Sequence, residues 1–138
     1  MSTIAAIRDA IGAALAPIGL EIHTYTRGTV NPPAAVILPA PGTFLEYHQT
    51  LDSAEGLLYH MRVVLLVAFA DAETGTDALD AYLEPSGPQS VSAAIEADPT
   101  LGGAVSFAVP ETAGRYGTLA YGGMDYLGCE LIVAVGAP

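Results

Sequence analysis

The 138-residue sequence contains no lysine and no tryptophan, and it has a single cysteine. Its only strong cations are Arg8, Arg27, Arg62 and Arg115, which stand against fifteen aspartates and glutamates and leave a formal net charge of −11. Nucleic-acid affinity depends on cationic groups that displace phosphate counterions, so this balance argues against a DNA- or RNA-binding module. The lone Cys129 excludes an intramolecular disulfide, and its place in an apolar strand pattern predicts a buried, inert thiol.

Charge of either sign is also scarce. Charged residues make up 14% of the chain and hydrophobic residues 51%, whereas a soluble domain has about 25% charged residues. Surfaces with so little charge are typical of subunits that become buried in an assembly. An ordinary composition rich in alanine and glycine is the alternative, and composition alone does not separate the two.

Long hydrophobic runs are missing as well. The run VVLLVAF at 63–69 is too short to cross a bilayer, which needs about 20 residues. The N-terminal segment has no basic start and is interrupted by Arg8 and Asp9, which argues against a signal peptide. We therefore expect a soluble protein without a membrane partner, assembled in a cytoplasm, and the length predicts a single domain over 1–138.

The periodicity of apolar residues predicts a helix, then strands, then two short helices, then strands again. Asp98-Pro99 should stop the third helix, and Ser86 with Gln89 has capping-box spacing at its start. This order predicts an α+β fold, a mainly antiparallel sheet with an N-terminal helix and two short helices packed on one face. The expected elements are helices over 4–18, 77–83 and 90–98, strands over 20–26, 34–38 and 104–109, and hairpins over 44–64 and around Gly122-Gly123.

The hairpin over 44–64 has a polar face and an apolar face. Its turn, DSAEG, has the acidic and glycine residues of a hairpin loop. If Leu51 pairs with Leu57, Glu46 lies opposite Arg62. The following apolar stretch makes the strand LLYHMRVVLLVAFA long, and we expect it to pair with or pack against a neighbouring subunit.

No pattern in the chain carries a catalytic signature. The same register places His48 opposite His60, a pair that could bind a transition metal, but no third ligand is evident, and a solvated face or a subunit contact is the alternative. DAETGTDALDAY lacks the glycine position and the closing glutamate of a calcium loop. The glycines of GRYGTLAYGG are not followed by the lysine of a phosphate-binding loop.

Several segments together are similar to one known family. IRDAIGAALAPIGLEI, NPPAAVILPAPG, MRVVLLVAF, LDAYLEPSGPQSVSAAIEADPTLGGAV and YLGCELIVAV resemble the tail terminator proteins of long-tailed, siphovirus-type actinobacterial phages. The similarity covers nearly the full chain. It consists of a pattern of small and apolar residues and includes no chemical motif.

The resemblance implies a structural virion protein that forms a homo-hexameric ring. Such a ring caps the tail tube protein, stops tube elongation, and joins the tail to the head-tail connector, or stopper, protein. It lies at the head-proximal end of the tail after assembly in the host cytoplasm, and DNA passes through its channel without specific binding. No enzymatic activity and no cofactor are implied.

Related functions remain alternatives. Stoppers, head completion proteins and minor tail proteins of the same phages are similarly small and also form rings, and a small-ligand-binding domain or an enzyme is a more distant possibility. For a ring, the candidate subunit-interface residues are Glu46, His48, His60, Arg62, Arg115 and Tyr116. The first four lie on the polar face of the predicted 44–64 hairpin.

Overall fold

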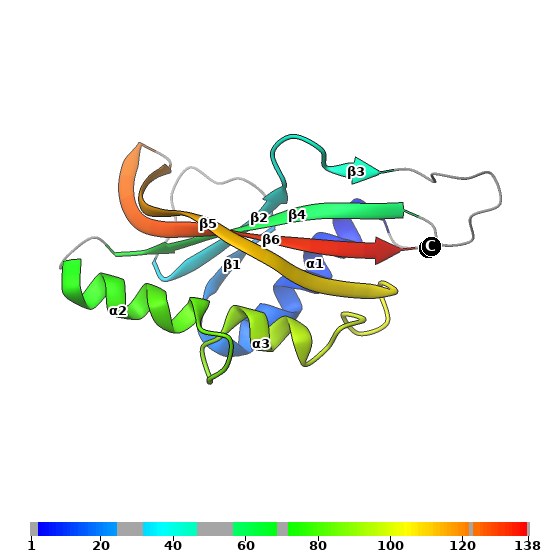
Figure 1. Cartoon of the computed structure of the whole chain (residues 1–138), viewed down its shortest axis with the longest axis horizontal. Helices are drawn as coiled ribbons and strands as arrows, with labels where there is room; N and C mark the ends of the chain where they lie inside the picture. Colours follow the sequence, from blue (N-terminus) through cyan, green and yellow to red (C-terminus); the bar gives the residue numbers. More distant parts are fainter. Residues whose placement is uncertain (1–2, 25–31, 47–56, 69–71, 122, 138) are drawn as a thin grey trace.

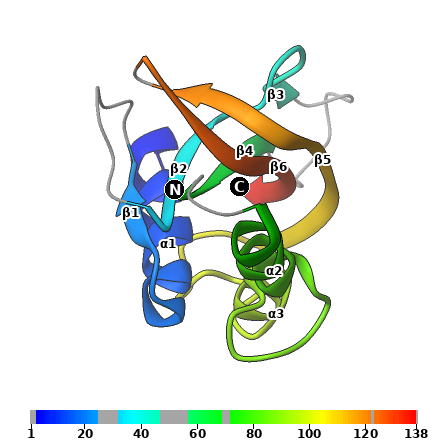
Figure 2. The same cartoon turned by 90° about the vertical axis from the view of Figure 1, so that its left-hand side faces the viewer.

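The computed structural model describes residues 3–24, 32–46, 57–68, 72–121 and 123–137. A six-stranded, mostly antiparallel sheet carries the helices on one side (Figures 1 and 2). This is the α+β fold predicted from the sequence. The elements are α1 (Ile4–Leu15), a 3₁₀ turn (Ala16–Ile18), β1 (Glu21–His23), β2 (Ala34–Pro39), β3 (Leu45–Glu46), β4 (Leu57–Val67), α2 (Ala72–Leu83), α3 (Val91–Glu96), β5 (Phe107–Tyr121) and β6 (Met124–Ala137).

The sheet order is β1-β2-β4-β6-β5, and β3 also pairs with β4. Among the described strands, β1 and β2 are the one parallel pair. The expectation that the long strand LLYHMRVVLLVAFA offers a free edge for pairing with a neighbouring subunit is wrong, because β4 lies in the middle of the sheet, between β2 and β6. The alternative, that it packs against a neighbour, stays a prediction. The continuous run Val63–Val67 of β4 is buried on both faces, as is typical of a central strand. The long strand at the edge is β5.

Helix α1 begins and ends at residues whose side chains explain its limits. The side chain of Thr3 accepts a hydrogen bond from the backbone N–H of Ala6, which caps the first turn. The α-helix stops at Leu15, three residues before the predicted end, and continues as a 3₁₀ turn that contains Pro17. Gly19 then adopts a φ of 87°, which favours glycine, and the chain turns into β1.

The two later helices differ from the expectation at their starts. Helix α2 begins at Ala72, earlier than the predicted acidic turn. The predicted capping box of Ser86 and Gln89 is wrong: the N-cap of α3 is Ser90, whose side chain accepts a hydrogen bond from Ala93 N–H. The Ser90 hydroxyl also donates to the carbonyl of Glu84, so this buried residue joins α3 to the end of α2.

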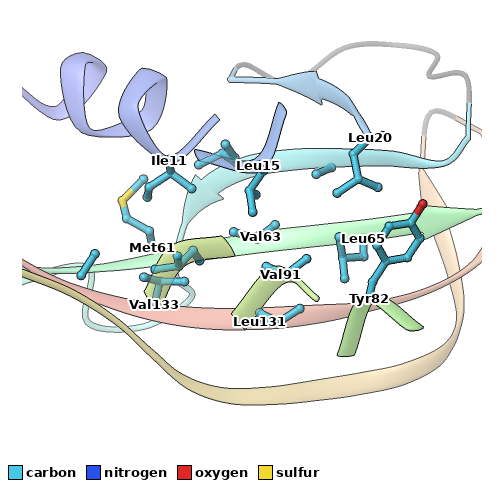
Figure 3. Packing of buried hydrophobic residues seen from close by; sticks show 14 of the residues in the cluster. Ile11, Leu15, Leu20, Met61, Val63, Leu65, Tyr82, Val91, Leu131 and Val133 are labelled. Carbon is cyan, nitrogen blue, oxygen red and sulfur yellow. The ribbon is translucent and has the colours of Figure 1, made fainter. Parts of the chain in front are cut away.

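The main core lies between the helices and the inner face of the sheet (Figure 3). Alternation along β4 sends every second side chain into it, and β6 contributes in the same way. Stripes at helical spacing on α1, α2 and α3 cover these strands. The fully or nearly fully buried members include Ile11, Leu15, Leu20, Met61, Val63, Leu65, Tyr82, Val91, Leu131 and Val133.

The predicted hairpin register is wrong, although the predicted faces are right. Glu46 lies opposite Leu58, not opposite Arg62. The difference is four residues, and an even shift keeps each side chain on its face because strand side chains alternate with a period of two. Glu46 therefore still shares a face with His60 and Arg62. The predicted turn and His48 lie outside the described residues.

Candidate interaction surface

The face of the sheet opposite the helices, here called the open face, carries most of the polar side chains of the central strands. In Figure 2 the helices gather below the sheet, and this face lies on the other side. The even-numbered residues of β4 point to it, among them His60, Arg62, Val64 and Leu66. Because none of the described helices packs here, charged groups can reach solvent without breaking the main core.

The tip of the β5–β6 hairpin covers one end of the open face. In Figure 1 its orange end rises on the side of the sheet away from α2. Register shifts between Pro110 and Thr112 and between Gly114 and Gly117 mark bulges in β5, and bulges bend a strand and increase its twist. A second, smaller cluster is buried below the tip: Ala34, Val36, Val64, Leu66 and Tyr126, with Leu38, Leu119 and Tyr121 packed against it.

His60 links carboxylates from two other strands. Its Nε2 lies 2.7 Å from Oε2 of Glu46 on β3, and its Nδ1 lies 3.5 Å from Oε1 of Glu111 on β5. Strand β6 runs between β4 and β5, and the residue opposite His60 there is Ala134. This small side chain, together with the bulge next to Glu111, leaves space for the carboxylate to extend across β6.

Arg62 forms the second ion pair of the open face. Its Nη1 donates to Oε2 of Glu130 on β6 at 3.1 Å. Glu130 is 8% exposed, and a carboxylate this far removed from water needs a paired cation, which Arg62 supplies. The Nε of Arg62 is buried and has no hydrogen-bond partner among the described residues.

Arg115 and Tyr116 sit together in the second bulge of β5 but point to different parts of the molecule. Arg115 has a φ of 54° and lines a cleft on the open face. Tyr116 donates a hydrogen bond of 2.6 Å to Oδ1 of Asp80 on α2. That hydrogen bond is the main reason why the pKa of Tyr116 is raised. Consecutive residues of a strand point to opposite faces, which accounts for the separation.

Two hollows lie on the open face. One, of about 490 Å³, is lined by Glu46 and His60 together with Ala40, Pro41, Thr43 and Ile132. The other, of about 390 Å³, lies below the hairpin tip and is here called the arginine cleft. Its lining residues are Leu38, Arg62, Val64, Leu66, Arg115, Thr118, Leu119, Ala120, Tyr121 and Glu130.

Exposed apolar side chains are concentrated on one hairpin. Within the described ranges, the large hydrophobic side chains that are exposed are Phe107, Val109, Tyr116 and Met124, at 41%, 48%, 47% and 57%. All four belong to β5 or β6. The outer edge of β5 is paired with no other described strand. Exposed apolar groups beside a free strand edge form a surface suited to another protein.

Cys129 is buried, as predicted, and points into the main core. Burial, and to a smaller extent the charge of Glu130, raises the pKa of its thiol to about 12. Over the residues that the structure describes, no group of three or more histidine, cysteine or acidic residues is placed to hold a metal ion. In the same part of the chain, no helix is both long and apolar enough to span a membrane.

The six predicted interface residues thus fall into three groups. The open face brings together Glu46, His60, Arg62 and Arg115, whereas Tyr116 contacts α2 and His48 is outside the described residues. Sequence reasoning missed the acidic partners Glu111 and Glu130. A signal existed for Glu130, because it is the only charged residue in the apolar stretch YLGCELIVAV. No comparable signal marks Glu111.

The arrangement as a whole offers charged and apolar groups for recognition. No protein-family model matches the chain, and no curated protein matches it either.

Proposed function

We propose that the chain is a structural subunit of a phage tail, a tail terminator that closes into a homo-hexameric ring at the head-proximal end of the tail tube. There it caps the tube protein, stops elongation and joins the stopper protein on the head side. The family and the number six come from the sequence resemblance. The physical support comes from the surface of the subunit.

The observation that carries the proposal is the concentration of exposed apolar side chains on the β5–β6 hairpin. Phe107 and Val109 stand on the open face beside the unpaired edge of β5. A copy that places a different surface against this hairpin makes a head-to-tail contact, and repeated head-to-tail contacts close into a ring when the rotation allows it. Such a contact buries the apolar groups and provides partners for the backbone N–H and C=O groups at the edge of β5.

The charge of the subunit fits a DNA channel. Each copy has a formal charge of −11, so a ring of several copies is strongly negative. An acidic wall repels phosphate and disfavours adsorption of DNA while it passes. A ring protein that had to grip DNA would need the opposite sign.

Electron microscopy of the parent particle tests the proposal. We expect a six-fold ring of this chain between the tail tube and the stopper. Absence of the chain from the head-proximal end, or a symmetry other than six, would contradict the proposal. A ring placed directly on the portal side, without contact to the tube, would instead indicate a stopper or a head completion protein.

A matched pair of variants separates assembly from folding. Val109→Glu adds a charge to the exposed apolar group, and we expect particles that lack the ring and carry tubes of uncontrolled length. Ser86→Glu adds the same charge to an exposed loop on the helix side, and we expect normal tails. Equal tail lengths in the two variants would count against the hairpin as the contact surface.

A further inference from the structure

The arginine cleft contains half of the arginines of the chain. Arg62 and Arg115 both line it, although the protein has four arginines and no lysine. Glu130 is the one acidic side chain in the lining, so the cleft has one positive charge in excess. A local positive excess is unusual in a subunit with a net charge of −11 and points to a negatively charged ligand.

The two guanidinium groups also have unused hydrogen-bonding capacity. Arg115 makes no hydrogen bond or ion pair with any residue that the structure describes. Arg62 is bound to Glu130 through Nη1, while its Nε is buried and without a partner in the same part of the chain. Because that Nε is closed off from solvent, the donors open to a ligand are those of the exposed Arg115 guanidinium, with the charge of Arg62 beside them.

Much of the remaining wall is aliphatic. Leu38, Val64, Leu66 and Leu119 line the cleft beside the two arginines, and Thr118 and Tyr121 add hydroxyl groups. Its volume of about 390 Å³ falls within the range of small-ligand sites, roughly 300–1,000 Å³. A ligand that fits must combine an anionic head with an apolar stem.

We propose that the arginine cleft binds a carboxylate group carried on an apolar stem. Arginine matches the planar, two-oxygen geometry of a carboxylate. The single charge of a carboxylate balances the single excess charge of the cleft, whereas a doubly charged phosphate would leave one negative charge uncompensated. The carboxylate comes either from a small organic acid or from an acidic side chain of a second copy of this chain. The site goes beyond the proposed function and does not depend on it.

Sodium hexanoate is the probe for the test. We expect saturable binding at low ionic strength, seen as shifts of the Arg115 and Leu119 signals in amide NMR spectra, and weaker binding as salt is added. Hexylamine has the same stem with the opposite charge, and we expect it to leave these signals unchanged. Absence of saturable hexanoate binding, or equal binding of both probes, would overturn the proposal.

Two substitutions with matched controls locate the site. Arg115→Gln should weaken hexanoate binding by at least about fivefold, as expected for a lost charge-assisted hydrogen bond. Arg8→Gln on α1 makes the same charge change outside the cleft and should leave affinity unchanged. Equal affinities of these two variants would place hexanoate elsewhere.

The second pair of variants tests the acidic residue of the arginine cleft. Glu130→Gln removes the competing carboxylate and should tighten hexanoate binding severalfold, while Asp77→Asn on α2 makes the same charge change on the helix side and should have no effect. Circular dichroism confirms that each variant is folded. Equal affinities of this second pair would also contradict the assignment.

Sedimentation velocity then identifies the natural source of the carboxylate. If it belongs to a second copy, the protein associates with itself as its concentration rises, and both hexanoate and Arg115→Gln reduce that association. If it belongs to a free acid, hexanoate binds without any change in the sedimentation coefficient. Either result is compatible with rings of any size in the particle, so this experiment and the test of the tail terminator proposal can fail independently.

Discussion

Arg62 on β4 and Glu130 on β6 form a diagonal ion pair across the strands, with 3.1 Å between Nη1 and Oε2. The residues directly opposite them are Ile132 and Val64. The pair therefore crosses between neighbouring rungs of the ladder, as long side chains on one face are able to do. It ties the centre of the open face together in a setting where both groups are largely removed from solvent.

Loss of the carboxylate should destabilise the protein. Glu130→Ala leaves the largely buried Arg62 without its acceptor, and we expect the free energy of unfolding to fall by about 1–3 kcal/mol. Urea denaturation measures it. The double variant Arg62→Met with Glu130→Leu should regain most of the loss, because removing both charges also removes their desolvation cost. A double variant less stable than Glu130→Ala would contradict this account.

The exposed carboxylate of the neighbouring cluster provides a contrast. Glu111 is 43% exposed and lies 3.5 Å from His60, and such pairs contribute about 0–1 kcal/mol. We expect Glu111→Ala to lower the free energy of unfolding by less than Glu130→Ala does. A larger loss at Glu111 would show that burial is not the deciding factor.

Gly128 cannot accept a side chain. A Cβ atom there would lie 2.2 Å from the carbonyl oxygen of Leu65 on β4 and 3.0 Å from Cδ1 of Leu119. A backbone atom within a sheet cannot move aside easily, so Gly128→Ala should lower the free energy of unfolding by about 1–3 kcal/mol, the usual cost of overpacking. Thermal and urea unfolding followed by circular dichroism provide the measurement.

Two other glycines of the same hairpin serve as controls. Nothing lies within 4 Å of a Cβ at Gly114, so Gly114→Ala should be neutral or stabilise by up to about 1 kcal/mol. At Gly136 the obstacle is the ring of Phe107, which is partly exposed and can rotate away, so Gly136→Ala should cost less than Gly128→Ala. An equal cost for all three would contradict steric contact as the deciding factor.

Cys129 should react slowly with thiol reagents in the folded protein. Burial raises the pKa of its thiol to about 12 from a normal value of 9.0, so at pH 8 the thiolate is scarce and inaccessible. Labelling of native protein at pH 8 should be far slower than labelling of the urea-unfolded chain. Equal rates would contradict a buried thiol.

The same shift gives a pH dependence. The pKa of the Cys129 thiol is higher in the folded than in the unfolded chain, so the folded state favours the protonated thiol. The contribution of this thiol to the free energy of unfolding is therefore complete below pH 9 and is lost as the pH rises from 9 to about 12. We expect the stability difference between the wild type and Cys129→Ala to fall over this interval. A difference that stays constant up to pH 12 would mean that the thiol ionises equally in both states.

Ser90 should contribute more than its neighbour Ser92. Ser90 caps α3 and donates to the Glu84 carbonyl, and loss of an N-cap typically costs about 0.5–2 kcal/mol. The hydroxyl of Ser92 donates a hydrogen bond to the side chain of Glu96, at 3.5 Å on the exposed side of α3. We therefore expect Ser90→Ala to lower the unfolding midpoint and Ser92→Ala to leave it nearly unchanged, and equal midpoints would argue against the cap.

The sequence by itself determined the local structure and the overall charge. Apolar spacing located α1 and β2, and alternation with an assumed hairpin register placed Glu46 with His60 and Arg62 on one face, which stayed correct although the register itself was wrong. Composition set the net charge and left a single thiol in an apolar strand. These properties depend on residues that are close in sequence, where helix and strand periods apply directly.

Only the tertiary structure decided the strand register, the sheet edge and the partners on the open face. A four-residue shift preserves alternation, so the sequence could not distinguish Leu58 from Arg62 as the residue opposite Glu46. The order of strands is a long-range property, and it made β5 the long edge strand and buried β4. Arg62 and Glu130 are 68 residues apart. Such contacts arise from the packing of whole strands and from bulges, which local periodicity does not encode.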